Sequence, residues 1–266
     1  MSYASSLDAL LSASPTGDFK SIFSTFSTSD NSSVYNTNLW GGGGHSLDFS
    51  GIIWHDDNTG DEPTGYASIA NGVAITKRHV ICTNHGGHGI GGNVTWIKRD
   101  GTLVTRNLSD GIKNIGGSDP NGFRVLYCNS DLPSGIAIYP VMAGAIPTGT
   151  PLIKLDQQNQ ALIADLFTLD LLMVQPTSPT RDQYYEVSIP GDSGSPVFAV
   201  SGTQLIYLTS LVTGGAGGGP FVRNYLSSIV DACRTLDARN AQTGYTPTVV
   251  RTATSRTLSL GLTIGV

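Results

Sequence analysis

The sequence predicts an all-β protein, and its composition, its short apolar runs and its turn spacing all support this. Of its 266 residues, 33 are glycine and only 13% are charged. The apolar residues occur in many short runs that glycine, asparagine and aspartate interrupt, which favours strands and turns over helices. About a dozen such runs, with turn signals about every 8–12 residues, are typical of a barrel or a sandwich.

Residues 1–48 are expected to extend from the body of the fold. A short helix capped by Ser5 or Ser6 is predicted first, and the apolar spacing of residues 19–26 predicts a second helical face. The four consecutive glycines at 41–44 predict a linker or a mobile loop. They do not suggest a phosphate site, because no strand-then-helix frame or lysine accompanies them.

The body of the fold is expected over residues 49–239. Strand patterns recur along it, at 49–55, 66–76, 79–82, 92–98, 102–107, 123–128, 135–141, 151–155, 196–200 and 204–213. The stretch 161–174 fits a helix or a strand pair, and its context favours strands. The apolar spacing of residues 223–236 predicts the one substantial helix, and residues 240–266 predict an extra hairpin or a tail.

Charge and cysteine content narrow the possible functions. The net charge is −5 and no basic block is present, so nucleic-acid binding has little support. The most apolar stretch, 162–174, is too short to span a bilayer, and the N-terminus shows no secretory pattern. We expect a soluble protein without cofactor or metal, in a compartment and an oligomeric state that the sequence leaves open. Three cysteines fit neither a disulfide framework nor a zinc motif, and burial is expected for Cys82, Cys128 and Cys233.

The stretch from Ile189 to Pro196 places a serine on a tight turn between two glycines. Ser193 follows an aspartate and precedes a glycine, and the glycines allow backbone conformations that a Cβ would forbid. This leaves room for a substrate carbonyl beside the serine hydroxyl and the amides of Gly191 and Ser193. Because a serine hydroxyl is a weak nucleophile by itself, the turn predicts a base and an orienting acid elsewhere in the chain.

The base is expected to be His85, one of five histidines. It ends a run that begins at Gly72, in which a Gly-Val-Ala-Ile-Thr strand turns into a second strand ending Thr-Asn-His. This run resembles the histidine motif of the chymotrypsin/trypsin-like serine proteases. The serine turn resembles the Gly-Asp-Ser-Gly-Gly-Pro motif of the same family, with Ser195 in place of the second glycine. The two motifs occur in the family's order, and the resemblance covers residues 49–237.

The resemblance implies a chymotrypsin-like double β-barrel with a C-terminal helix and with extra segments at both ends. The barrels would be residues 49–145 and 146–239, with the site in the cleft between them. The implied activity is that of a serine endopeptidase, which hydrolyses polypeptide substrates through an acyl-enzyme intermediate. His85 would take the proton of Ser193, and the amides of Gly191 and Ser193 would hold the oxyanion.

The acid of the triad is expected between the base and the nucleophile. In the family it stands on a loop that leads into a strand of the type Asp-Ile-Ala-Leu. The closest match is Asp131, although Pro-Ser-Gly intervenes before the Ile-Ala-Ile run at 136–138. The alternatives are Asp100, Asp110 and Asp119, each in a polar turn where an aspartate commonly caps the backbone.

Two further histidines are expected to play other roles. His79 stands where the family has a buried aromatic residue, so we expect it to pack in the core. His88 is expected to be a solvated loop residue or to line the cleft. The polar cluster at 55–60 is interpreted as a hairpin tip rather than a metal site.

The substrate pocket that the resemblance implies is not that of trypsin. Val187 stands at the pocket floor, where an aspartate would select lysine or arginine, and Ser210, Thr213 and Gly214 stand in its walls. Specificity for Lys or Arg is therefore not expected. No activation-cleavage motif is present, so Asp192 is expected to meet a partner other than a new N-terminus or to cap its own turn.

Two alternatives from other classes stay open. The chain could be a catalytically inactive protease fold that serves as a binding or structural module, which its unmatched ends and low charge allow. It could also be a serine esterase with the same triad and a pocket for a small acyl group. The absence of expected disulfides makes the chain resemble bacterial or viral family members more than secreted animal ones.

Overall fold

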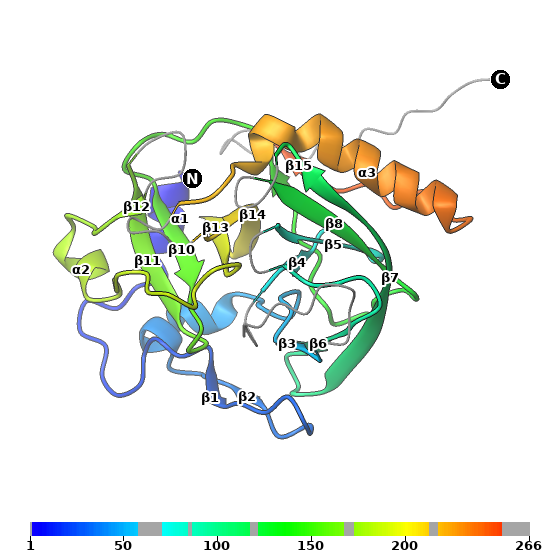
Figure 1. Ribbon diagram of the computed structural model, residues 1–266. Helices are drawn as coiled ribbons and strands as arrows, with labels where there is room; N and C mark the ends of the chain where they lie inside the picture. Colours follow the sequence, from blue (N-terminus) through cyan, green and yellow to red (C-terminus); the bar gives the residue numbers. More distant parts are fainter. Residues whose placement is uncertain are drawn as a thin grey trace.

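The computed structural model describes residues 2–57, 71–84, 87–117, 122–167, 173–212 and 218–251. Within these ranges the chain forms a two-stranded, a six-stranded and a seven-stranded sheet, with one longer helix near the C-terminus (Figure 1). The predicted all-β class is therefore confirmed.

The six-stranded sheet comes from the first half of the chain, in the order β3-β6-β7-β8-β5-β4. Its strands are β3 (His55–Asp56), β4 (Val73–Ala74), β5 (His79–Thr83), β6 (Asn93–Ile97), β7 (Leu103–Ile115) and β8 (Phe123–Cys128). All of its neighbouring strands are antiparallel. Ile52, just before β3, also forms a bridge with Val73 in β4, so the sheet curls and its two edges are joined.

The longest strand, β7, provides much of this curvature. Its 13 residues pair with β6 at one end and with β8 at the other (Figure 1). The register to β8 shifts between Leu108 and Asp110 and again between Ile112 and Ile115. Such irregularities bend a strand and increase its twist. The prediction covered only residues 102–107, because polar residues interrupt the apolar alternation beyond them.

The seven-stranded sheet has the order β12-β11-β10-β13-β14-β9-β15. Its strands are β9 (Val141–Met142), β10 (Pro151–Leu155), β11 (Ala161–Leu166), β12 (Met173–Val174), β13 (Pro196–Ser201), β14 (Gln204–Ser210) and β15 (Val249–Val250). Most pairs are antiparallel, whereas β9 runs parallel to both β14 and β15. The strand pair predicted within 161–174 is confirmed as β11 and β12.

Two predicted strands, at 49–55 and 135–141, do not form regular ladders apart from their last residues, which belong to β3 and β9. The two segments lie beside each other and use side chains as partners. The hydroxyl of Ser50 accepts from the backbone of Ala137 at 2.9 Å, and that of Tyr139 accepts from Gly51 at 3.1 Å. Most of their apolar side chains are still buried, which explains why the apolar runs suggested strands. Part of the strand predicted at 66–76 lies outside the described residues.

The N-terminal segment contains α1 (Tyr3–Asp8), β1 (Phe23–Thr25), β2 (Val34–Tyr35) and the 3₁₀ segment η1 (Leu39–Ser46). Helix α1 begins earlier than predicted, because the hydroxyl of Ser2 caps it by accepting from Ser5 N at 3.1 Å. The helical face predicted at 19–26 is wrong, since Phe23 pairs with Tyr35 in a small sheet and packs on Trp54.

The glycines at 41–44 pack against the body of the protein, so the prediction of a linker or a mobile loop is wrong. The fully buried Trp40 donates from Nε1 to the carbonyl of Ala161 at 2.9 Å. A Cβ placed on Gly43 would lie 2.2 Å from the carbonyl oxygen of Leu10. Glycine is needed here for close backbone contact rather than for mobility.

The helices of the second half are α2 (Pro179–Asp182), η2 (Val222–Tyr225) and α3 (Leu226–Arg239). Helix α3 confirms the predicted helix and packs on β7 and β8. Its buried face includes Ile229, Cys233 and Leu236. After α3 the chain returns to the seven-stranded sheet as β15, so residues 240–251 join the two sheets. The rest of the predicted hairpin or tail, residues 252–266, lies outside the described residues.

The three cysteines are free and buried, as predicted. Cys82 lies in β5, Cys128 in β8 and Cys233 in α3. Burial raises the pKa of the Cys82 thiol to about 11 and that of Cys128 to about 12, because a thiolate is poorly solvated in an apolar core.

Candidate active site

The serine turn, residues 189–196, begins with a tight reverse turn. The backbone N–H of Asp192 donates to the carbonyl of Ile189 at 3.1 Å, across Pro190 and Gly191. Gly191 has a φ of +107°. Proline in the second position and glycine with positive φ in the third are the signature of a type II turn, so the local sequence dictates this geometry.

Ser193 follows the reverse turn and is held on both sides. The carbonyl of Asp192 accepts from Ser195 N at 3.1 Å. Gly194, with a φ of +91°, donates to the carbonyl of Leu211 at 2.7 Å, and Leu211 donates to Ser195 O at 2.7 Å. The side chain environment is tight, since Ser193 is only 9% exposed. The predicted nucleophile therefore stands on a fixed turn at the start of β13.

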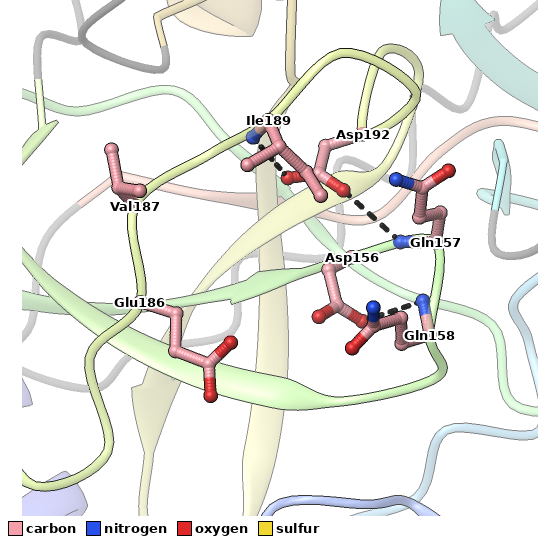
Figure 2. A pocket seen from close by; sticks show the side chains of 7 residues that line it. All are labelled: Asp156, Gln157, Gln158, Glu186, Val187, Ile189 and Asp192. Carbon is pink, nitrogen blue, oxygen red and sulfur yellow. Dashed lines mark hydrogen bonds between the residues drawn. The ribbon is translucent and has the colours of Figure 1, made fainter.

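Asp192 is the anchor of the serine turn. It is 1% exposed, and its carboxylate oxygens accept the N–H of Ile189 at 2.9 Å and that of Gln157 at 3.2 Å (Figure 2). The side-chain amide of Gln157 also donates to the carbonyl of Pro190 at 3.2 Å. Asp192 thus caps its own turn and also binds the loop between β10 and β11.

A pocket of about 320 Å³ lies beside the serine turn. Its described lining residues are Asp156, Gln157, Gln158, Glu186, Val187, Ile189 and Asp192 (Figure 2). Burial raises the pKa of the Asp156 carboxyl to about 6, against two backbone N–H donors that lower it. Glu186 pairs with Lys20 at 2.8 Å. The pocket is therefore polar and acidic on the side of the loop between β10 and β11.

Of the predicted specificity residues, Val187 lines this pocket and Ser210 does not. Val187 is 61% exposed and projects to the opposite side of the chain from Glu186 (Figure 2). Ser210 is fully buried, with its hydroxyl 2.9 Å from that of Tyr207. Thr213 and Gly214 lie outside the described residues, and the wall of the substrate pocket stays a prediction.

Strand β5 leads directly to the predicted base. His85 and Gly86 lie outside the described residues, but the residue before them is well held. The backbone N–H of Asn84 donates to the carbonyl of Gly122 at 2.8 Å, and its side-chain amide donates to that of Gly117 at 2.9 Å. Asn84 therefore contacts both flanks of the stretch 118–121.

The serine turn contacts the first half of the chain at Asn71, which precedes β4 by two residues. A Cβ placed on Gly194 would lie 2.5 Å from the side-chain oxygen of Asn71, so the serine turn packs directly on this side chain. Strands β5 and β14 also pack against each other. The residue after Ser193 therefore contacts the segment that leads into β4.

Asp131, the predicted acid of the triad, has its described partners near the start of β5. It accepts hydrogen bonds from Arg78 Nε and, at 2.9 Å, from the Tyr245 hydroxyl. Arg78 directly precedes β5, and the five residues of this strand span about 13 Å at 3.3 Å per residue. These partners are therefore at the opposite end of β5 from the end that leads to residue 85. The role of Asp131 as the acid stays a prediction, because His85 lies outside the described residues.

Two of the three alternative acids have described contacts. Asp100 caps an exposed turn, and Asp110 accepts from Asn240 Nδ2 at 3.2 Å. Asp119 lies outside the described residues, within the stretch whose flanks both contact Asn84. In the antiparallel pair, the chain that enters β8 adjoins the chain that leaves β5, since Phe123 is opposite Thr83.

His79 and His88 are both buried. The packing role predicted for His79 is confirmed, since it is fully buried edge-on against Tyr127, and burial lowers its pKa to about 4. The solvated loop predicted for His88 is wrong, because it is 1% exposed and lies 2.6 Å from Asp56. Its Nε2 is 2.5 Å from the carbonyl of Asn71 and must carry a proton, so His88 is no base for Ser193.

Three general findings complete the description of the site. No group of three His, Cys, Asp or Glu side chains among the described residues is arranged to hold a metal ion. None of the described helices combines the length and the apolar character needed to cross a bilayer.

Comparison with protein-family models and with curated proteins finds no match to this chain. The chemistry of the site must therefore be inferred from its own residues.

Proposed function

We propose that the chain is a serine endopeptidase, with Ser193 as the nucleophile and His85 as the base. The observation that carries this proposal is the contact at Asn71. There the serine turn packs against the segment that leads into β4, and β4 pairs with β5, the strand that leads to residue 85. The two motifs that resemble the chymotrypsin-like family are far apart in the sequence, and both lead to this contact.

The architecture that goes with this proposal is a pair of barrels. The six-stranded sheet, whose edges are joined through Ile52 and Val73, would be the first barrel and would supply His85. The seven-stranded sheet would be the second and would supply Ser193. The packing of β5 on β14 supports a site between them.

The proposed reaction is acyl transfer to Ser193 followed by hydrolysis. His85 accepts the proton of the serine hydroxyl as its oxygen bonds to the substrate carbonyl carbon, and returns it to the leaving amine as the C–N bond breaks. Water then hydrolyses the acyl-enzyme with the same base. We assign the orienting acid to Asp119 in place of Asp131, for the reasons of register given above.

The oxyanion is proposed to bind to the amides of Gly191 and Ser193. The support for this is the fixed geometry of the reverse turn, which Asp192 and Gln157 hold from two sides. Donors of this kind act because they are already oriented before charge develops, and losing one typically costs about 10²–10³ in rate.

The test is covalent labelling by a fluorophosphonate probe. We expect the folded chain to be labelled at Ser193, and Ser193→Ala to abolish labelling without unfolding the protein. A peptide library then separates a peptidase from an esterase, and we expect no preference for Lys or Arg. Failure of the folded wild-type chain to react would contradict the proposal.

One observation favours the alternative of a catalytically inactive module. Ser210, predicted in the wall of a substrate pocket, belongs to the core, and the exposed Val187 forms no enclosed floor with it. Such a module would fold normally and would not react with the probe, so the same experiment distinguishes the two functions.

A further inference from the structure

A single arginine, Arg124, donates hydrogen bonds to backbone carbonyls on both sides of residue 85. Arg124 lies in β8 and is 4% exposed. It donates from Nη1 to the carbonyl of His88 at 2.6 Å and from Nη2 to the carbonyl of Asn84 at 3.1 Å. A guanidinium is planar and rigid, so two hydrogen bonds from its two ends fix the separation of these two carbonyls. Asn84 and His88 flank residues 85–87, of which Gly87 is described.

The same segment makes close backbone contact with its surroundings. A Cβ placed on Gly87 would lie 2.4 Å from the carbonyl oxygen of Thr83 and 2.8 Å from Nε of Arg124. Only glycine permits the chain to return this close to β5 and to the guanidinium. The backbone at Gly87 is therefore held between Thr83 and Arg124.

The imidazole of His88 connects this segment to a second strand. Nδ1 lies 2.6 Å from a carboxylate oxygen of Asp56 in β3, and Nε2 lies 2.5 Å from the carbonyl oxygen of Asn71. A carbonyl oxygen only accepts, so Nε2 is the donor to Asn71. Both ring nitrogens of His88 therefore have polar partners, which offsets the cost of burying the imidazole.

Asn71 continues the connection to the nucleophile. Its carbonyl accepts from His88, its backbone N–H donates to Ile53 at 3.0 Å, and its side chain packs against Gly194. Asp56, His88 and Asn71 thus form a buried bridge from β3 to the serine turn. Polar groups join the two sheets at this point, and hydrogen bonds fix the geometry of Asp56, His88 and Asn71.

We propose that Arg124 and the Asp56–His88 pair are positioning residues that set the distance between His85 and Ser193. They act through the backbone at Asn84 and His88 and through Asn71, and they do not touch the substrate. This inference rests on the proposed serine hydrolase function, because only then do His85 and Ser193 have to meet.

The experiment uses Arg124→Lys and Asp56→Asn in the full chain. Lysine keeps the charge but is unable to bridge two carbonyls, and asparagine keeps the shape of Asp56 but removes its charge. The matched control is Arg106→Lys, since Arg106 donates to the carbonyl of Asp131 on the surface, away from the site. The fluorophosphonate labelling rate is measured per folded molecule, with the folded fraction taken from thermal unfolding.

We expect both test variants to label about 10²-fold more slowly than the wild type, since a displacement of about 1 Å at reacting groups costs this much. With a peptide substrate, kcat is expected to fall while KM changes little. Arg106→Lys is expected to behave as the wild type. A purely structural role would lower the folded fraction and leave the rate per folded molecule unchanged.

The outcomes separate this inference from the function on which it rests. If the wild type reacts and either folded test variant reacts at the wild-type rate, the positioning role is overturned. If the folded wild type does not react at all, the proposed function is overturned, and the positioning role with it. Should Arg124→Lys fail to fold, Asp56→Asn decides the question by itself.

Discussion

The two sides of the candidate site are held in different ways. The serine turn is fixed mainly through the backbone, by a Pro-Gly reverse turn and the carboxylate of Asp192, with further hydrogen bonds from Gln157 and Leu211. The histidine side is fixed by side chains from distant strands, above all Arg124 and Asp56. One side is encoded locally, whereas the other depends on the fold around it.

Because side chains from distant strands hold it, the histidine side should be the more sensitive to substitutions at positions far from it in the sequence. The largest effect is expected for its acid. Asp119→Asn should lower kcat/KM by on the order of 10⁴, because the imidazole would lose its orienting and charge-stabilising partner. The measurement is turnover of a peptide or ester substrate at neutral pH.

Asp131→Asn is the matched control for this prediction. Asp131 is exposed and pairs with Arg78, and surface ion pairs contribute only about 0.2–1 kcal/mol to stability. Its replacement should leave turnover close to that of the wild type. The opposite pattern, with Asp131→Asn inactive and Asp119→Asn active, would return the acid to Asp131.

The serine side is expected to respond most to loss of its anchor. Asp192→Asn replaces one acceptor oxygen with an NH₂ group, which faces a backbone N–H donor of Ile189 or Gln157. The turn should loosen, and the labelling rate should fall by about 10²–10³ as the oxyanion donors lose their orientation. Glu186→Gln, which lines the same pocket from its exposed side, serves as the control and should label normally.

A smaller effect is expected at Gly191, whose φ of +107° is unfavourable for any residue with a Cβ. Gly191→Ala should lower the free energy of unfolding by about 1–3 kcal/mol and should also slow labelling. Gly202→Ala, at a φ of +62° in the turn between β13 and β14, should lower stability while the labelling rate is kept. Denaturant unfolding and labelling of both variants test whether the strain at Gly191 is tied to the site.

The two sides should also differ in the sign of their pH dependence. The pKa of His79, on the histidine side, is lowered by burial from 6.5 to about 4, so the unfolded chain binds more protons between these values. The pKa of Asp156, on the serine side, is raised by burial from 3.8 to about 6, so there the folded chain binds more. His79 therefore makes the free energy of unfolding rise with pH, and Asp156 makes it fall.

Two variants separate these contributions. Relative to the wild type, the stability of His79→Gln should decrease as the pH rises from 4 to 6.5, and that of Asp156→Asn should increase from pH 4 to 6. Each slope should be at most about 1.4 kcal/mol per pH unit. The free energy of unfolding is measured with urea at several pH values. If its difference from the wild type changes with pH in the same direction for both variants, the assigned burial of one of the two groups is contradicted.

The contrast between the two sides also explains what the sequence could predict. Strands β8 and β10 and helix α3 follow from continuous apolar patterns, and the reverse turn follows from Pro190 and Gly191. The bridge through Asp56, His88 and Asn71 has no local signal, because it joins residues whose neighbours in sequence are unrelated. Burial of His88 in particular depends on contacts that only the folded chain supplies.

The acid of the triad depends on strand pairing that a local pattern does not show. The run Ile-Ala-Ile at 136–138 matched the strand expected after Asp131, but no regular strand forms there. Strand β8, at 123–128, was predicted correctly, and it pairs with β5, which leads to residue 85. The proposal of Asp119 rests on this pairing, whereas the prediction of Asp131 rests on the local pattern.

The buried thiols give the chain a set of natural reporters. Thiolate is the form that reacts with alkylating reagents, and burial raises the pKa of Cys82, Cys128 and Cys233 alike. Iodoacetamide should therefore modify the native protein only when a region opens transiently. Two of the thiols lie in neighbouring strands and the third in α3. The rates at which the individual cysteines are alkylated would report how often the six-stranded sheet opens and how often the helix detaches from it. No cysteine has to be introduced for this measurement.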